Sequence, residues 1–228
     1  MRSAEAIIRA LALAAAAAAL AGCSTIAADL RGAFGGGAAA APAKEQESGK
    51  EGAKEAALPP VNPQAQRAFD EASLALKAGR TAEAQRGLVA LTKSNPELAG
   101  PHANLGLIDM QAGKLAEAAA ELEEAVRLSP AQPRYFNALG IVYRQQGAFA
   151  KARAAYEKAI ALDPRYAPAQ LNLGILFDLY LWDSARAVEC YDRYLALSPG
   201  GDDKVKKWIA DLKNRQQQQS MAKTQETK

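Results

Sequence analysis

The chain has 228 residues, which allows one ordinary domain with tails or two small domains. Its net charge of +3 is too balanced to predict nucleic acid as a main partner, and two cysteines with one histidine are too few for an ordinary zinc site. An alanine-rich composition with only 6% aromatic residues favours closely packed helices over a bulky β core.

The first 22 residues have the pattern of a secretory signal peptide. Arg2 and Arg9 give a positive start, and the apolar run from Ile7 to Leu20 is shorter than the roughly 20 residues that span a membrane. The run ends in Leu20-Ala21-Gly22-Cys23, which resembles the lipobox of bacterial lipoproteins. The resemblance implies cleavage before Cys23 and lipidation of its thiol. The alternative is an ordinary secretory signal with a coincidental cysteine.

Lipidation of Cys23 would leave Cys190 as the only other cysteine, so no intrachain disulfide is expected. Lipoproteins of this type carry several acyl chains, and each buried methylene contributes about 0.8 kcal/mol, so attachment would be long-lived. Ser24 follows, where an aspartate would favour the inner membrane in the enterobacterial sorting pattern. The resemblance therefore implies the outer membrane, with the protein facing the periplasm.

Residues 23–63 are predicted to form the lipidated end and a disordered tether. Large apolar residues are scarce there, so little burial would offset the entropy of ordering Gly35-Gly36-Gly37, the Lys/Glu stretch from Lys44 to Glu55 and the prolines that follow. A flexible chain of about 40 residues spans roughly 35 Å on average. The tether would hold the folded part off the membrane.

Residues 64–200 repeat with a period of 34 or 35. The prolines follow a polar residue at Asn95-Pro96, Ser129-Pro130, Asp163-Pro164 and Ser198-Pro199. Glycines recur at Gly79, Gly113 and Gly147, small residues at Ala72, Gly106, Gly140 and Gly174, and large residues at Leu88, Leu122, Tyr156 and Tyr191. Proline ends a helix, a turn glycine permits a left-handed cap, and a small residue permits close contact between paired helices.

This pattern resembles the tetratricopeptide repeat family, whose period is 34 residues. The third unit is the best copy, with Phe136, Leu139-Gly140, Tyr143, Ala152 and Tyr156 in place. The resemblance covers residues 65–199 and implies an all-α helical solenoid of about four helix-turn-helix repeats. Their predicted ranges are 65–98, 99–132, 133–166 and 167–200. No unit can bury its apolar face alone, so neighbours are expected to stack.

The first and fourth units depart from the pattern. Ala68 and Glu71 stand where large apolar residues are expected, so the first unit is degenerate or serves as an N-terminal cap. The fourth unit has one extra residue and the glycine-free turn Tyr180-Leu181-Trp182-Asp183. Asp183 is predicted to cap the next helix. Trp182 is either a hydrophobic staple before that cap or an exposed contact for a partner.

Residues 201–215 are predicted to form a capping helix. Val205, Trp208, Ile209 and Leu212 share one helical face, as the end of a solenoid needs for solubility. The remaining residues, 216–228, begin with four glutamines and are predicted to be disordered.

The sequence contains no catalytic set, and no cofactor or metal is expected. His102 falls at a helix-pairing position, which favours a packing role. Cys190 is predicted to be a buried, inert thiol, because no histidine lies in the third or fourth unit. No phosphate-binding glycine loop of Walker or Rossmann pattern is present. An independent enzyme is therefore not expected.

In the resembled family, the first helix of each unit lines a concave face that meets the ligand. Mapped onto this chain, the inward positions are Asn104, Leu107, Gln111, Arg134, Asn137, Ile141, Arg144, Gln145, Asn172, Ile175 and Asp178. The three apolar positions, 34 residues apart, would form a ladder, and the arginines add positive charge. The predicted partner is an extended or helical protein segment, partly apolar and acidic. The alternative is that the ladder serves packing between units. The oligomeric state is left open.

Lipobox, tether and repeats together resemble the outer-membrane lipoproteins that act as pilotins for type IV pilus secretins. The resemblance implies a membrane-anchored scaffold that helps to assemble a cell-envelope, pilus or secretion complex. An adaptor for peptidoglycan-remodelling enzymes is the alternative, and it differs only in its partner. A binder of anionic polymers through the basic C-terminal helix is disfavoured by the balanced charge.

Overall fold

The computed structural model describes residues 62–226, so the predicted signal peptide, Cys23 and nearly all of the predicted tether lie outside the described residues. The described residues form helices joined by short turns, with no strand among them, which confirms the predicted all-α class. The chain divides into two compact units, one ending at Gly87 and the other beginning at Leu88.

The unit that ends at Gly87 contains α3 (Pro63–Lys77) and the start of α4 (Thr81–Ser94). Pro63 suits the first helical position, where its missing amide hydrogen is not needed, and Asn62 caps the helix by accepting from the Gln64 amide at 2.9 Å. A methyl group built on Gly87 would lie 3.5 Å from Cβ of Ala72, an ordinary contact. Small residues therefore mark the approach of α3 to α4 here.

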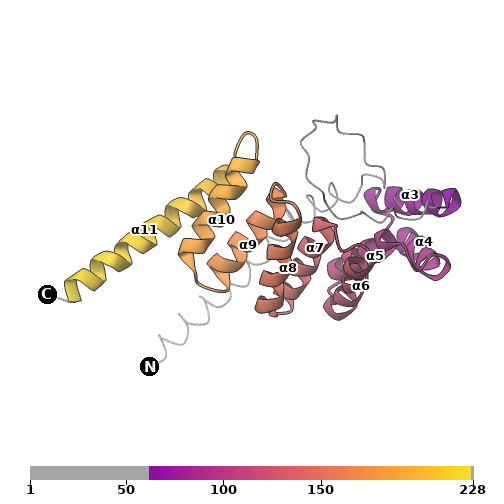
Figure 1. Cartoon of the computed structure of the whole chain (residues 1–228), viewed down its shortest axis with the longest axis horizontal. Helices are drawn as coiled ribbons and strands as arrows, with labels where there is room; N and C mark the ends of the chain where they lie inside the picture. Colours follow the sequence, from indigo (N-terminus) through magenta and orange to yellow (C-terminus); the bar gives the residue numbers. More distant parts are fainter. Residues whose placement is uncertain (1–61, 227–228) are drawn as a thin grey trace, which may run out of the picture. The chain divides into compact units, whose positions relative to one another are not determined.

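The unit that begins at Leu88 holds three further helix pairs and a terminal helix, coloured from magenta to yellow in Figure 1. The pairs are α5 (Ala99–Gln111) with α6 (Leu115–Leu128), α7 (Pro133–Gln145) with α8 (Phe149–Leu162), and α9 (Ala167–Leu179) with α10 (Ser184–Leu197). The terminal helix is α11 (Asp203–Glu226). Consecutive pairs contact each other through α6 with α7 and α8 with α9, so each pair buries the open side of its neighbour.

The turn glycines adopt the left-handed conformation that the sequence predicted. Gly113 and Gly147 have φ values of 75° and 76°. In the turn after α7, the Gly147 amide donates to the Arg144 carbonyl at 3.1 Å and the Ala148 amide donates to the Tyr143 carbonyl at 2.8 Å. This Schellman arrangement satisfies carbonyls that the end of the helix would leave unpaired, and it turns the chain back along α8.

Within each of these pairs, a glycine on the first helix faces a large side chain on the second. A Cβ added to Gly140 would lie 2.5 Å from Cε1 of Tyr156, and one added to Gly174 would lie 2.6 Å from Cδ1 of Tyr191. Both tyrosines are almost completely buried. The two helices can approach this closely only because the glycines have no side chain.

The turn between α9 and α10 reverses the chain direction without a glycine. Its extra residue lengthens the hydrogen-bonded closure, so that the Asp183 amide donates to the Phe177 carbonyl at 2.9 Å. Trp182 takes the left-handed conformation, with φ 54°, and it is the only non-glycine residue of residues 62–226 to do so. Asp183 caps α10 by accepting from the Arg186 amide at 3.0 Å, which confirms the predicted cap.

The terminal helix is longer than predicted. Asp202 caps it, and Val205, Ile209 and Leu212 are buried on the expected face. The helix then continues to Glu226, although residues 216–228 were predicted to be disordered. Glutamine, methionine, alanine and lysine all favour helix, and no glycine or proline stops it before that point. No helix among residues 62–226 has the length and apolarity to cross a membrane.

The close approach of α7 and α8 predicts that Gly140→Ala lowers stability. The added methyl would press on the buried Tyr156 ring, at an expected cost of about 1–3 kcal/mol. Gly87→Ala is the matched control, because its methyl finds ordinary space and alanine favours helix by about 0.5–1 kcal/mol. Thermal unfolding followed by circular dichroism measures both. A Gly140→Ala midpoint equal to that of the control would contradict this account.

The left-handed Trp182 predicts a second difference. Trp182→Gly and Trp182→Ala both remove the exposed ring, but only alanine keeps a Cβ in the left-handed conformation. The glycine variant should be more stable by about 1 kcal/mol. Chemical denaturation of the two variants measures the difference. Equal stability, or a more stable alanine variant, would show that the backbone of this turn is not strained.

Candidate functional site

The first helices α5, α7 and α9 carry the predicted partner-binding positions, and the structure divides them by burial. Gln111 and Gln145 are exposed, whereas Arg134, Arg144 and Ile175 are half-buried. The buried positions are Asn104, Leu107, Asn137, Ile141, Asn172 and Asp178. The predicted apolar ladder is therefore uneven. Burial favours the packing role for Leu107 and Ile141 and leaves Ile175 the most accessible of the three.

The buried amides join neighbouring units instead of lying open. Asn172 on α9 donates from Nδ2 to Oδ1 of Asn137 on α7 at 3.0 Å. Both side chains are at most 5% exposed, so the hydrogen bond satisfies polar groups that burial would otherwise penalise. The pair connects α7 to α9, two helices that also touch directly. These two positions fix how the third and fourth pairs stack and offer little to a ligand.

Arg144 is one of two half-buried arginines on this face. Its Nε lies 3.4 Å from the Tyr156 hydroxyl, its Nη1 lies 3.4 Å from the Tyr180 hydroxyl, and its Cζ lies 5.6 Å from the centre of the Tyr180 ring. Burial raises the pKa of Tyr156 to about 12, against the lowering effect of the Arg144 guanidinium. The hydroxyl therefore stays protonated at neutral pH. Tyr156 is therefore a neutral neighbour of the arginine.

Asp178, the acidic position on α9, already has hydrogen-bond partners within the chain. Its Oδ1 accepts from Nη2 of Arg215 on α11 at 3.3 Å, and its Oδ2 accepts from the Tyr191 hydroxyl at 3.4 Å. Tyr191 in turn packs at a tilt against Trp208 of α11, with ring centres 5.6 Å apart. The sequence placed Asp178 on the binding face but gave no sign of Arg215 as its partner, because the expected helix ended at that residue.

The α9–α10 turn forms a small exposed apolar cluster made of Leu179, Leu181 and Trp182. Trp182 is 77% exposed, which excludes the predicted hydrophobic staple, since a staple packs against the first turns of the next helix. The ring of neighbouring Tyr180 packs on Phe149 at 4.9 Å, so the base of the turn is fixed while its tip is open. The structure agrees with an exposed Trp182, and its role as a contact for a partner stays a prediction.

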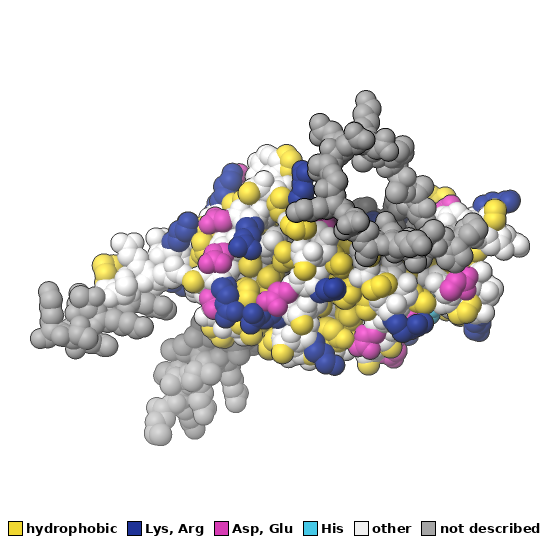
Figure 2. Space-filling view, in the orientation of Figure 1, with side chains coloured by type: hydrophobic (Ala, Val, Ile, Leu, Met, Phe, Trp, Pro, Cys, Tyr) yellow, Lys and Arg dark blue, Asp and Glu magenta, His cyan; other side chains and the backbone are white. Residues whose placement is uncertain are grey.

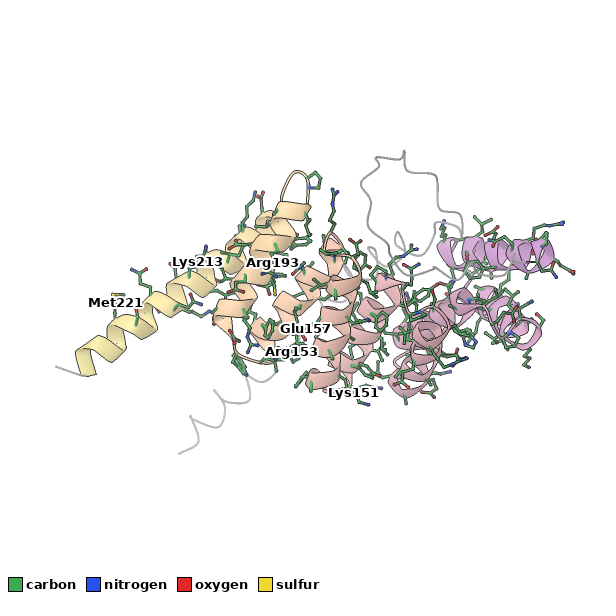
Figure 3. The ribbon with its side chains drawn as sticks, viewed as in Figure 1. Lys151, Arg153, Glu157, Arg193, Lys213 and Met221 are labelled. Carbon is green, nitrogen blue, oxygen red and sulfur yellow. The ribbon has the colours of Figure 1, made fainter. Side chains whose placement is uncertain are left out.

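The second helices α8 and α10 carry basic and acidic side chains that are largely in contact with solvent. Lys151, Arg153 and Glu157 on α8 and Arg193 on α10 are labelled in Figure 3, and Figure 2 shows basic and acidic side chains close together among apolar ones on this face. Arg153 and Glu157 form an ion pair at 2.7 Å. Exposed pairs of opposite charge contribute little to stability and do not mark a site.

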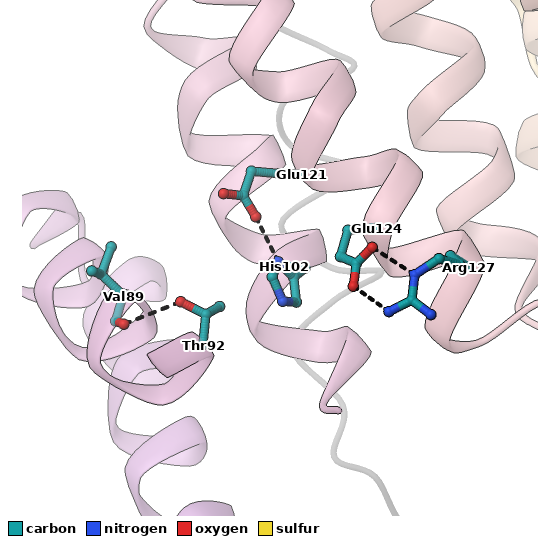
Figure 4. Close-up of polar contacts among 6 residues, drawn as sticks. All are labelled: Val89, Thr92, His102, Glu121, Glu124 and Arg127. Atoms are coloured by element: carbon teal, nitrogen blue, oxygen red, sulfur yellow. Dashed lines mark hydrogen bonds and ion pairs between the residues drawn. The ribbon is translucent and has the colours of Figure 1, made fainter. Parts of the chain in front are cut away.

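The predicted packing roles of His102 and Cys190 agree with the structure. His102 is half-buried and joins α5 to α6 through Nδ1, which lies 2.7 Å from Oε2 of Glu121 (Figure 4). Cys190 is buried, and burial raises the pKa of its thiol to about 11, so it stays protonated at neutral pH. Within residues 62–226, no three acidic, histidine or cysteine side chains come together as a metal site would require.

Comparison with known proteins supports the repeat architecture. A family profile described as tetratricopeptide repeat matches residues 69–133, 104–167 and 137–202. No curated protein sequence matches the chain. Among solved structures, MamA is similar with a TM-score of 0.60 at 22% identity, over 70% of this chain and 86% of that one.

Two further solved structures share the fold. The structure of Pseudomonas aeruginosa pilF is similar with a TM-score of 0.61 at 22% identity, over 70% of this chain and 72% of that one. A Thermobaculum terrenum O-GlcNAc transferase mutant is similar with a TM-score of 0.55 at 22% identity, over 58% of this chain but only 26% of that one. At such identities the likeness shows the fold alone.

The overlapping profile matches extend over residues 69–202, which is more than half of the chain, and they coincide with the helix pairs and turn glycines described above. Repeats of this kind are typically non-catalytic and serve as scaffolds that bind other proteins. The chain belongs to the tetratricopeptide repeat family.

Proposed function

We propose that the chain is a lipid-anchored scaffold at the outer membrane, facing the periplasm, and that its first helices hold a segment of a partner protein. The observation that carries this proposal is the stack of α5, α7 and α9, which leaves Gln111 and Gln145 exposed at corresponding places on α5 and α7 and leaves Ile175 on α9 partly accessible. Repeated accessible positions on stacked helices suit an extended or helical segment, which can meet each unit in turn.

The N-terminal sequence supports the location. The lipobox-like Leu20-Ala21-Gly22-Cys23 would anchor the chain, and the following stretch of some forty residues would let the repeats reach a partner away from the bilayer. The combination resembles pilotin lipoproteins, which supports assembly of a pilus or secretion complex. An adaptor for peptidoglycan-remodelling enzymes is the alternative, and the identity of the bound partner separates the two.

The proposed anchor predicts that Cys23→Ser abolishes stable membrane attachment. Without a lipidated thiol, the described helices provide no membrane-spanning segment. In cells fed a labelled fatty acid, the wild-type chain should incorporate the label and stay with the membranes in high salt, whereas Cys23→Ser should do neither. Cys190→Ser is the matched control and should behave as the wild type, because that thiol is buried. A labelled Cys23→Ser chain would contradict the anchor.

The proposed binding face predicts a position-specific crosslink. A photoreactive residue placed at Gln111 or Gln145 should crosslink to one envelope protein in intact cells, because both positions are exposed on first helices. The same residue at Lys158, which is exposed on the second helix α8, should not give that adduct. Because all three positions are exposed, the substitutions spare the core. The same adduct from all three positions would count against the binding face.

A further inference from the structure

Arg144 differs from the arginines that form ion pairs in residues 88–226. Arg153 pairs with Glu157 at 2.7 Å and Arg186 pairs with Asp183 at 2.6 Å, so each of these arginines has a carboxylate partner close by in the sequence. Both guanidinium groups also lie over the ring of Phe177. Arg144 is half-buried, yet it has no carboxylate within ion-pair distance among the described residues. Partial burial of a guanidinium ordinarily favours a counter-ion beside it.

The one acidic residue among the predicted binding positions does not pair with Arg144. Asp178, on the next first helix, is bonded to Arg215 from α11 and to the Tyr191 hydroxyl. The terminal helix therefore supplies the cation that neutralises Asp178. Arg144 is left with two phenol hydroxyls, each at 3.4 Å, and with the face of the Tyr180 ring. These are long, neutral contacts that orient the guanidinium without neutralising it.

The Arg144 guanidinium has N–H donors that the two tyrosine hydroxyls do not use. A guanidinium has five N–H donors, and the two hydroxyls engage only the Nε and Nη1 groups. The Tyr180 ring and hydroxyl hold the planar group in place, so little side-chain freedom is lost when a further acceptor binds. A carboxylate matches this planar fork with two parallel, charge-assisted hydrogen bonds. Exposed Gln145, the next residue on α7, lies beside it in the sequence and is open to solvent.

We propose that Arg144 receives a carboxylate of the partner segment, either an Asp or Glu side chain or a free C-terminus. This inference rests on the proposed function, since it names the chemistry by which the first helices recognise their ligand. Tyr180 acts as a positioning residue for the guanidinium. The unit-three helix α7 then provides the charged contact, and accessible Ile175 on α9 provides an apolar one.

The test is selection of peptides on the purified full chain from two random libraries, one with free and one with amidated C-termini. The wild type should enrich Asp or Glu at one position of the selected peptides, or enrich only free C-termini, which identifies the source of the carboxylate. Replacing that Glu by Gln, or amidating that terminus, should weaken binding about tenfold. For Arg144→Gln the same replacement should change affinity little. Arg127→Gln is the surface control, because the Arg127 side chain on α6 is 67% exposed, and it should behave as the wild type.

The outcomes separate the two proposals. Selected peptides with no acidic preference, or an acidic preference that persists in Arg144→Gln, would overturn the carboxylate assignment and leave the scaffold function standing. Failure of every form of the chain to select peptides would overturn the scaffold function and this inference with it. If Arg144→Gln loses helicity, Arg144→Lys keeps the charge but not the fork and should retain the preference at reduced affinity. In the wild type, only the acidic peptide should lose affinity as salt rises.

Discussion

The close approach of paired helices is the constraint on which the rest of this structure depends. Gly140 and Gly174 leave room for Tyr156 and Tyr191, whose rings fill the space that a side chain on the first helix would occupy. The rings are large and buried, so each contributes substantially to the apolar core of its pair. The distance between first and second helices follows from it. So does the placing of the tyrosine hydroxyls, which reach from the second helices to Arg144 and Asp178.

The tyrosines thus link the fold to its polar face. A leucine fills the same place in the second unit, at Leu122, and brings no hydroxyl with it. In the third and fourth units the phenol oxygens instead reach charged groups on the first helices. The terminal helix completes the arrangement, because Arg215 neutralises Asp178 and Trp208 covers Tyr191. In the fourth unit Asp178 is therefore paired with Arg215, whereas Arg144 in the third unit has no carboxylate partner among the described residues.

Local features of this fold could be predicted from the sequence, and contacts set by long-range packing could not. Gly147 at a turn and Asp183 at a cap act on their own neighbours, so their roles follow from a few residues. The Asn137–Asn172 hydrogen bond and the Asp178–Arg215 contact join residues 35 and 37 apart, and they depend on how whole helices stack. The length of α11 was also missed, because its glutamine-rich end looks like a tail although nothing in it breaks a helix.

The chain contains two tryptophans, and both lie in the last part of the structure. Trp182 is exposed in the turn between α9 and α10, and Trp208 of the terminal helix packs at a tilt on Tyr191. Repeat arrays can unfold unit by unit, because each unit is stabilised mainly by its neighbours. Tryptophan emission would then report only the unfolding of the C-terminal end, and unfolding of the first three units would not change it. Tryptophan emission of this protein therefore measures the folding of the final repeat and its capping helix, not of the whole solenoid.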